Sequence, residues 1–222
     1  MTENFGFILY NDQPPDPNRM ASASFGHSKG VVMMDGNTGV WLSHSTPKFP
    51  AGTKKTTFWP SSGNQNGQTF FCGTYEYSEF QNIAVQLMWH IMTSLAGNRF
   101  FSLAKYHRFG DDLYSGLLQK DLGTAIYAKS WGRMRNPLPS NCSIQHSVLN
   151  VKMVQLYDAF PITVDHSKWC VSVNISRPWT CIADMNRDRS QMSRGGGAVC
   201  TDLPAVWSAF SQAVYISEPC PP

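Results

Sequence analysis

The sequence lacks three signatures, and each absence excludes a class of protein. None of its six cysteines belongs to a C-x-x-C pair, which argues against a zinc ribbon or finger. No stretch approaches the unbroken apolar run of about 20 residues that a bilayer span requires, so no membrane span is expected. The opening MTENFGFILYNDQPPDP has no basic region followed by an apolar core, so no secretory signal is recognisable. What is left is a globular chain of 222 residues, long enough for one domain or two joined halves.

The charge is low and slightly positive. The formal net charge is +3 with histidine neutral, and protonation of the six histidines in an acidic compartment would strengthen the attraction to a polyanion. The cysteine count is even, and Asn-x-Ser glycosylation triplets begin at Asn141 and Asn174. Together these features favour an oxidising, secretory or endolysosomal compartment, in tension with the missing signal.

The local patterns predict a β-rich chain. FGFILY is expected to be a buried strand, VVMMDGNTGVWLSHS a hairpin, TFFCGTYEY a further strand, and residues 51–68 a loop. Residues 78–104 are expected to be helical with an interruption near Gly97, and GDDLYSGLLQ an Asp-capped helical turn. TAIYAKSW, SVLNVKMVQLYDAF and PWTCIADMNR predict three more strands.

The order of these segments repeats along the chain. We therefore expect an α/β layered fold of two related β-rich halves with helices packed outside. The prolines of NPLPSNCS place the boundary after residue 136. Residues 1–136 and 137–222 would form one compact unit.

One triplet occurs twice. GHSKG at Gly26 to Gly30 returns as DHSKW at Asp165 to Trp169. With six histidines and nine lysines, composition alone gives about a quarter of one H-x-K triplet, so two are improbable by chance. On a strand, side chains two residues apart point the same way, so the histidine and lysine of each copy would face one site.

Two imidazoles and two ammonium groups suit a phosphate. The lysines would hold its non-bridging oxygens, one histidine would attack phosphorus, and the other would protonate the leaving oxygen. For a single copy, a polar strand end facing solvent is the better explanation, but the second copy reverses that preference. A metal site is disfavoured because lysines repel a cation and no carboxylate shares the spacing.

Several stretches carry a specific resemblance. They are FILYNDQPPDP, GHSKGVVMMD, WLSHSTPKFP, FGDDLYSG, LPSNCS, DHSKWCVS, PWTCIADMNR and GGGAVCTDLPAVWSAF. In these the chain resembles the deoxyribonuclease II family, acid endonucleases of the phospholipase D-like superfamily, and most closely the alpha form. The resemblance implies a phospholipase D-like fold and hydrolysis of DNA at acidic pH. It also implies that no metal or other cofactor is needed, and that the ends carry 3′-phosphate after a phosphohistidine intermediate.

The resemblance also assigns residues. His27 with Lys29 and His166 with Lys168 are the active pairs, with His27 expected as nucleophile and His166 as general acid. His44 follows the first motif about where the superfamily has a supporting Asn, and Asn186 is the candidate in the second half.

The chain also departs from the family pattern. The family's N-terminal segment and a stretch after residues 88–90 have no counterpart here, so we expect Cys72 to lack its family partner. The resemblance further implies disulfides Cys142–Cys220 and Cys181–Cys200, a free Cys170, and a lysosomal or secretory location.

Two alternatives stay open. One is an inactive relative that at most binds DNA or partner chains, because a missing strand leaves unpaired backbone groups. The other is a phospholipid phosphodiesterase, which is weaker because no apolar segment for a membrane surface stands out. Basic residues near the motifs are candidates to guide the DNA backbone, although a solvated face explains most of them: Lys48, Lys54, Lys55, Arg177, Arg187, Arg189 and Arg194. The tryptophans are expected in the core: Trp41, Trp169 and Trp179.

Overall fold

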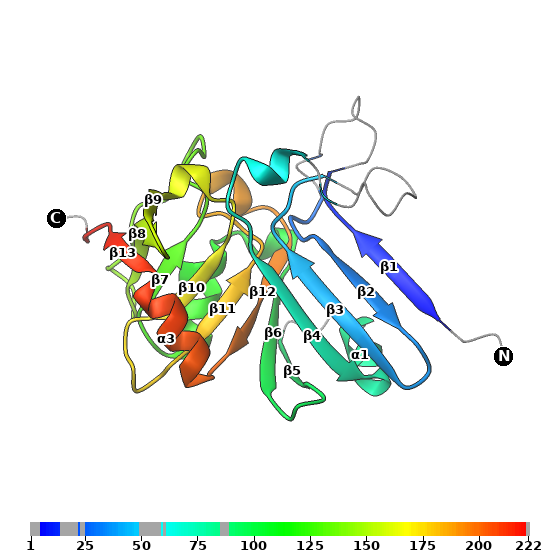
Figure 1. Ribbon diagram of the computed structural model, residues 1–222. Coiled ribbons are helices and arrows are strands. Elements are labelled where there is room, and N and C mark those ends of the chain that lie inside the picture. Colours follow the sequence, from blue (N-terminus) through cyan, green and yellow to red (C-terminus); the bar gives the residue numbers. More distant parts are fainter. Residues whose placement is uncertain are drawn as a thin grey trace.

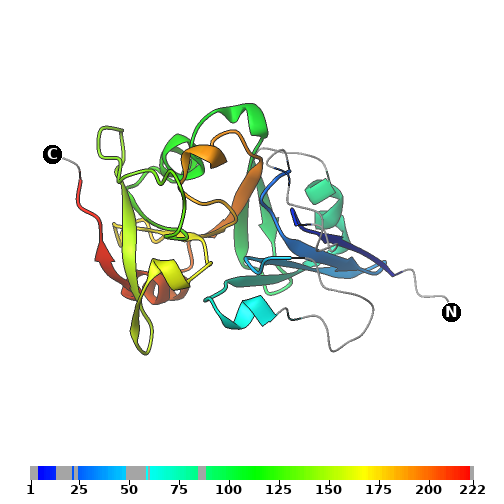
Figure 2. The ribbon, with the colours of Figure 1, turned by 90° about the horizontal axis from the view of Figure 1, so that it is seen from above.

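The computed structural model describes residues 5–13, 22, 25–48, 59, 61–84 and 89–220. Two β-sheets lie side by side, a smaller one coloured blue to cyan and a larger one coloured green to red (Figure 1). Seen from above, they remain adjacent (Figure 2). This is a mixed α/β protein rich in β-sheet, as expected. Within the described residues, no helix is both long and apolar enough to cross a membrane.

The smaller sheet is antiparallel, in the order β1-β2-β3-β4. Its strands are β1 (Gly6–Tyr10), β2 (Gly30–Met34), β3 (Thr38–His44) and β4 (Phe70–Glu76), and α1 (Tyr77–Ala84) follows. Asp35 closes the predicted hairpin, because its Oδ1 accepts hydrogen bonds from the backbone N–H groups of Asn37 and Thr38 at 2.7 and 2.8 Å. The predictions for this hairpin and for β4 are confirmed.

The larger sheet has the order β13-β8-β7-β10-β11-β12-β6-β5, with β9 paired to β8. Its strands are β5 (Trp89–Thr93), β6 (Arg99–Lys105), β7 (Ile126–Lys129), β8 (Val148–Gln155), β9 (Ala159–Pro161), β10 (Trp169–Ser172), β11 (Thr180–Ala183), β12 (Gly196–Thr201) and β13 (Val214–Ser217). The helical elements are η2 (Ser61–Asn64), η3 (His107–Phe109), η4 (Leu113–Leu118), α2 (Gln119–Leu122), η5 (Ile162–Val164), η6 (Arg189–Gln191) and α3 (Pro204–Gln212). Among the described strand pairs, only β7–β8 is parallel, and an isolated parallel bridge also joins Gly67 to Asp165.

Four neighbouring strands of the larger sheet repeat the smaller one. β7, β10, β11 and β12 follow each other across the sheet as β1, β2, β3 and β4 do, and a helix follows the last strand in both cases. The register agrees as well, because Gly30 lies opposite Tyr10, and Trp169, at the same place after its motif, lies opposite Lys129. We call β1–β4 the first repeat and β7 with β10–β12 the second. β7 precedes residue 136 but pairs with β10 beyond it, and the boundary there stays a prediction.

Two sequence predictions are wrong. Residues 78–104 are not one helix: α1 ends at Ala84, and β5 and β6 form a hairpin around Gly97, whose φ of 80° suits the turn. Pairing of β6 with β12 outweighs the local helix propensity. β1 is a strand as predicted, but it is not buried, because it lies at the end of its sheet with Phe7 and Ile8 both 62% exposed.

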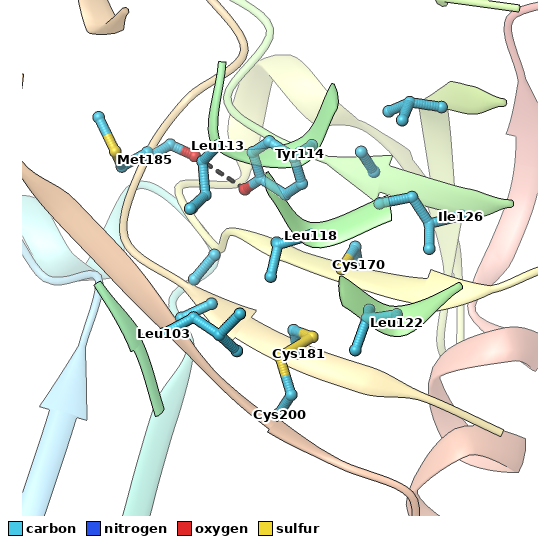
Figure 3. Close-up of a cluster of buried hydrophobic side chains, with 14 of the residues drawn as sticks. Leu103, Leu113, Tyr114, Leu118, Leu122, Ile126, Cys170, Cys181, Met185 and Cys200 are labelled. Atoms are coloured by element: carbon cyan, nitrogen blue, oxygen red, sulfur yellow. Dashed lines mark hydrogen bonds between the residues drawn. A yellow bond between two sulfur atoms is a disulfide. The ribbon is translucent and has the colours of Figure 1, made fainter. Parts of the chain in front are cut away.

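The core places the loops that carry chemistry. One cluster joins the two sheets, with Val32, Tyr75 and Phe80 of the smaller sheet and its helix packed against Met92 and Val199 of the larger. A second lies under the second repeat (Figure 3), where η4 covers the sheet and the Tyr114 hydroxyl donates to the Met185 carbonyl at 2.8 Å. That bond fixes the loop after β11.

The implied disulfides are both present. Cys142 bonds to Cys220, and Cys181 bonds to Cys200 between β11 and β12. Cys170 is free and buried, whereas Cys72 is free and exposed. The three tryptophans named above pack in or against the core clusters, as expected. Most of the predicted loop 51–68 lies outside the described residues, although η2 falls within it.

Candidate active site

Both motifs occupy the extended residues just before a strand, β2 for the first and β10 for the second. They are therefore not on the strands themselves, but their places in the two repeats are equivalent. The backbone N–H of His27 donates to Gly195 O at 2.9 Å, and that of His166 donates to Gly67 O at 2.8 Å. Gly195 lies just before β12 and Gly67 just before β4, so each motif is held by the other repeat.

The two motif lysines are buried and related by the same symmetry. Lys29 Nζ donates to the carbonyl of His27 at 3.2 Å, and Lys168 Nζ donates to the carbonyl of His166 at 2.8 Å. The carbonyls of the two lysines accept from matching positions, His44 N at 3.0 Å and Ala183 N at 2.8 Å.

The charges of the motifs act across the site. Lys168 is among the groups that lower the pKa of His27, and Lys29 is among those that lower the pKa of His166. Burial, followed by the charges of Lys29 and Lys129, lowers the pKa of Lys168 to about 7. Ala183 N donates to the Lys168 carbonyl, and the next residue, Asp184, contacts His27 and Ser28, so the side chains of His27, Lys29, His166 and Lys168 lie near one another.

A hydrogen bond at Nδ1 fixes the orientation and the tautomer of the His27 ring. Nδ1 lies 2.5 Å from the backbone carbonyl of Asp184, which can only accept a hydrogen bond, so Nδ1 carries the proton and Nε2 keeps its lone pair in the neutral ring. Burial, aided by the Lys29 charge, lowers the pKa of His27 well below its ordinary value. The geometry leaves a neutral imidazole with a free Nε2.

A carboxylate and an arginine complete the first motif. Asp12 Oδ1 lies 2.5 Å from Lys29 Nζ, and Asp12 Oδ2 accepts from Arg194 Nη2 at 3.1 Å and lies 3.9 Å from His27 Nε2. Burial acts to raise the pKa of Asp12, but the charges of Lys29 and His27 outweigh it and hold the pKa below its ordinary value. Asp12 thus balances the charge of Lys29.

Asp184 links the two motifs. Its carboxylate accepts from the Ser28 hydroxyl and, at 2.8 Å, from Gly197 N. Burial raises the pKa of this carboxyl, although both motif lysines oppose the rise. Asp184 therefore supports the first motif from the loop after β11, a strand of the second repeat.

His166 is placed differently from His27. Its ring lies 4.5 Å from the Trp131 ring, tilted by 57°, and among the described residues its ring nitrogens have no hydrogen-bond partner. Burial, followed by the charges of Lys168 and Lys129, lowers the pKa of His166 to about 4. Lys168 has no carboxylate within 4 Å in the described part of the chain.

The two supporting residues predicted from the resemblance lie near the motifs. His44 ends β3 with its ring stacked on Phe70 at 5.8 Å, and burial, followed by the Lys29 charge, lowers the pKa of His44 to about 4. Its Nδ1 is buried without a hydrogen-bond partner. Asn186 is buried, and its Oδ1 accepts from Trp131 N at 3.1 Å, so it contacts the residue that lies on His166.

Two of the other basic residues named above contact the protein itself, whereas Lys48 and Arg189 are exposed. Arg187 is buried and pairs with Asp112 at 2.9 Å, which corrects its assignment as a guide for DNA. Arg177 donates to the Gly123 carbonyl at 3.1 Å. Lys54 and Lys55 lie outside the described residues.

Sequence reasoning missed Asp12, Trp131 and Asp184, which touch the motif histidines. The strand register could have revealed the first two, because each lies two residues beyond the position opposite Gly30 or Trp169. Within the described ranges, no group of three or more His, Cys, Asp or Glu side chains is arranged to hold a metal ion.

Comparison with known proteins gives consistent matches. The sequence model of the deoxyribonuclease II family matches residues 1–93 and 90–220. Deoxyribonuclease-2-alpha of Sus scrofa is 38% identical, over 99% of this chain and 72% of its own. Plancitoxin-1 of Acanthaster planci is 35% identical over 98% of this chain and 72% of its own. Deoxyribonuclease-2-beta of Homo sapiens is 31% identical over 99% of this chain and 72% of its own.

Proposed function

This chain belongs to the deoxyribonuclease II family, a family of nucleases, and we propose that it is an acid endonuclease that cleaves DNA to 3′-phosphate ends without a metal ion. The observation that carries the proposal is that two H-x-K motifs from two repeats lie close together, each hydrogen-bonded to the other repeat, with Asp184 of the second repeat bonded to His27 of the first motif. We propose a phospholipase D-like fold for the two repeats on the same ground.

The site is built for an anion. Lys29 and Lys168 are each 4% exposed, and each holds one backbone carbonyl of its own motif. Asp12 balances the charge of Lys29, but Lys168 has no carboxylate within 4 Å among the described residues, so its buried charge favours a ligand that brings negative charge. A phosphodiester supplies that charge together with the two non-bridging oxygens that the lysines can hold.

The proposed chemistry proceeds in two steps. His27 Nε2 attacks phosphorus, an N–P bond forms, and the P–O5′ bond breaks while His166 gives its proton to the leaving O5′. Water then attacks the phosphohistidine, His166 takes a proton from that water, and the N–P bond breaks. The products are a 5′-hydroxyl and a 3′-phosphate, and both histidines return to their starting states.

The two histidines need opposite protonation states. His27 must be neutral to attack, and burial and the neighbouring lysines favour that state even in acid. His166 must be protonated to act as acid, and its pKa of about 4 should rise when a phosphodiester anion binds beside it. Activity therefore falls as the pH rises through the pKa of His166, which places the working range on the acidic side.

The supporting residues have proposed roles as well. Asp184 O holds the proton on Nδ1 of His27 and so keeps Nε2 free. His44, whose pKa is lowered in part by the Lys29 charge, is a candidate to support the first motif, whereas Asn186 supports the second through Trp131. We propose a lysosomal or secretory location, supported by the two disulfides and by the exposed Asn174 of a glycosylation triplet.

Cleavage of supercoiled plasmid at about pH 5 in the presence of a chelator tests the proposal. The wild-type chain is compared with His27→Ala and His166→Ala, and circular dichroism confirms that each is folded. We expect chelator-resistant nicking that both variants lose, with 3′-phosphate ends. A folded wild-type chain that binds DNA without cleaving it would support the inactive alternative. Nicking that survives His166→Ala would contradict the assigned site.

A further inference from the structure

A third lysine holds the second motif. Lys129, the last residue of β7, is 0% exposed, and its Nζ contacts three oxygens of the motif. It donates to the backbone carbonyls of Asp165 at 2.7 Å and Ser167 at 2.8 Å, and it pairs with Asp165 Oδ2 at 2.7 Å. Such a buried ammonium persists only where its charge and donors are satisfied.

The bonded carbonyls flank His166 on both sides. Lys129 donates to the carbonyls of the residues before and after His166. Lys168 donates to the carbonyl of His166 itself at 2.8 Å. Three successive carbonyls are therefore held by two buried lysines. This arrangement fixes the backbone from which the His166 ring projects toward Trp131.

In the described part of the chain, the first motif has no such clamp. The residue that occupies the position of Lys129 there is Tyr10, which lies opposite Gly30 as Lys129 lies opposite Trp169. Tyr10 Oη accepts a hydrogen bond from Trp41 Nε1 at 2.8 Å, within its own repeat. Lys129 thus belongs to the second motif alone.

Lys129 also pairs with the carboxylate of Asp165, which directly precedes His166. Asp165 Oδ2 accepts from the Ser167 hydroxyl at 2.8 Å and Asp165 Oδ1 from Ser167 N at 2.9 Å, which leaves Lys129 as its cationic partner. In the first motif, the carboxylate of Asp12 pairs with the motif lysine itself. Lys168 therefore keeps its positive charge free for a ligand.

We infer that Lys129 is a positioning residue, which holds the backbone around His166 and keeps Asp165 away from Lys168. The inference rests on the proposed function, since it assigns Lys129 to the histidine that donates the proton. The charged groups that act on His166 are Lys168, Lys129 and Lys29, which lower its pKa, and Asp165, which raises it.

Two variants and one control distinguish the effect of the Lys129 charge from the effect of its hydrogen-bond geometry. Lys129→Met/Asp165→Asn removes the pair without leaving an unpaired buried charge, and Lys129→Arg keeps the charge but changes its geometry. Lys120→Met, which removes an exposed lysine of α2, is the matched control. Thermal unfolding selects the variants that remain folded.

The first readout is independent of catalysis. Histidine NMR titration, with His166 assigned by the loss of its signal in His166→Ala, measures the pKa of His166 in each folded variant. Lys129 lowers this pKa more than Asp165 raises it, so the double variant should titrate at higher pH than wild type, while Lys120→Met should not shift. An unchanged pKa of His166 in the double variant would overturn the inference, whatever the fate of the proposed function.

The second readout is the pH profile of plasmid cleavage. We expect kcat of the double variant to fall roughly a hundredfold. The alkaline limb of its pH profile should move to higher pH. Lys129→Arg should lose kcat while its alkaline limb remains near that of wild type. Inactivity of the wild-type chain would contradict the proposed function and leave the titration to decide on Lys129. Wild-type rates in the folded double variant would contradict the positioning role.

Discussion

The two motifs have the same sequence pattern and equivalent positions, yet their surroundings differ. Two residues beyond the strand position opposite each motif, the first repeat has Asp12 and the second has Trp131. Asp12 lies 3.9 Å from Nε2 of His27, whereas the Trp131 ring lies on His166 at 4.5 Å. One histidine faces a carboxylate and the other faces an indole.

The motif lysines differ in the same way. Lys29 is paired with Asp12, but the carboxylate of the second motif is taken by Lys129, so Lys168 has no carboxylate partner among the described residues. A duplicated scaffold therefore holds two chemically unequal halves. In the proposed mechanism, this inequality separates the histidine that acts as nucleophile from the one that acts as acid.

The largest effect should come from separating the two histidine roles. Thymidine 3′-(4-nitrophenyl phosphate) has a leaving group that needs no proton, so it bypasses the general acid. We expect His27→Ala to lose about 10⁴-fold or more of activity on both plasmid and this ester. His166→Ala should lose plasmid cleavage but release up to one nitrophenolate per protein in a burst.

Stopped-flow absorbance measures that burst, and His146→Ala provides a control at a histidine outside the site. A burst from His27→Ala with none from His166→Ala would exchange the two roles.

The next effect concerns stability of the first motif. Asp12→Asn leaves the buried Lys29 without its counter-charge and should cost about 3 kcal/mol in the free energy of unfolding. The pKa of Asp12 is lowered in the folded protein, so its contribution is present above its ordinary value of 3.8 and is lost as the pH falls through the lowered value.

Denaturant unfolding at several pH values checks this expectation. The difference between wild type and Asp12→Asn should be constant from about pH 7 to pH 5 and should narrow only below about pH 4. A difference that disappears already at pH 5 would show that the pair with Lys29 does not hold.

A smaller effect is expected at the indole that marks the second motif. Trp131→Ala removes the ring against His166 and should lower kcat roughly tenfold, because such aromatic contacts contribute about 1 kcal/mol. Trp131→Phe keeps a ring there and should retain most of the activity. Equal losses in the two variants would mean that the contact does not position His166.

The smallest effect tests the repeat itself. Cys181 lies opposite Cys200 and forms a disulfide, and at the equivalent place Leu42 lies opposite Cys72. Leu42→Cys should therefore form a second cross-strand disulfide and raise Tm by a few degrees, a net gain of about 1 kcal/mol after the loss of leucine packing. Non-reducing mass mapping and calorimetry measure both quantities. Two thiols that stay reduced under oxidising conditions would show that the register of the two repeats is not equivalent.

The sequence predicted what local pattern determines. The hairpin of β2 and β3, the strands β4, β7, β8 and β11, and the Asp112 cap of η4 follow from alternation and turn residues. The repeated H-x-K triplet identified the four motif side chains that the structure brings together. The helix expected over residues 78–104 failed because β6 pairs with β12, a strand far away in sequence.

The remaining site residues depend on register. Asp12 and Trp131 have no motif in common, and they become equivalent only through the strand that each follows. Lys129 lies within the predicted strand TAIYAKSW, and nothing in that pattern marks it, because its contacts come from the loop before β10. These positions are determined by tertiary pairing and not by local propensity.

The most direct test of the account is to find the covalent intermediate. In the proposed mechanism, His166→Ala lacks the group that activates water, so thymidine 3′-phosphate should accumulate on the protein after the nitrophenyl ester is cleaved. An alkaline quench preserves the N–P bond, and peptide mapping by mass spectrometry then locates the adduct. The proposed two-histidine mechanism predicts a thymidine phosphoryl group on His27. An adduct on another residue, or nitrophenolate release with no adduct, would contradict it.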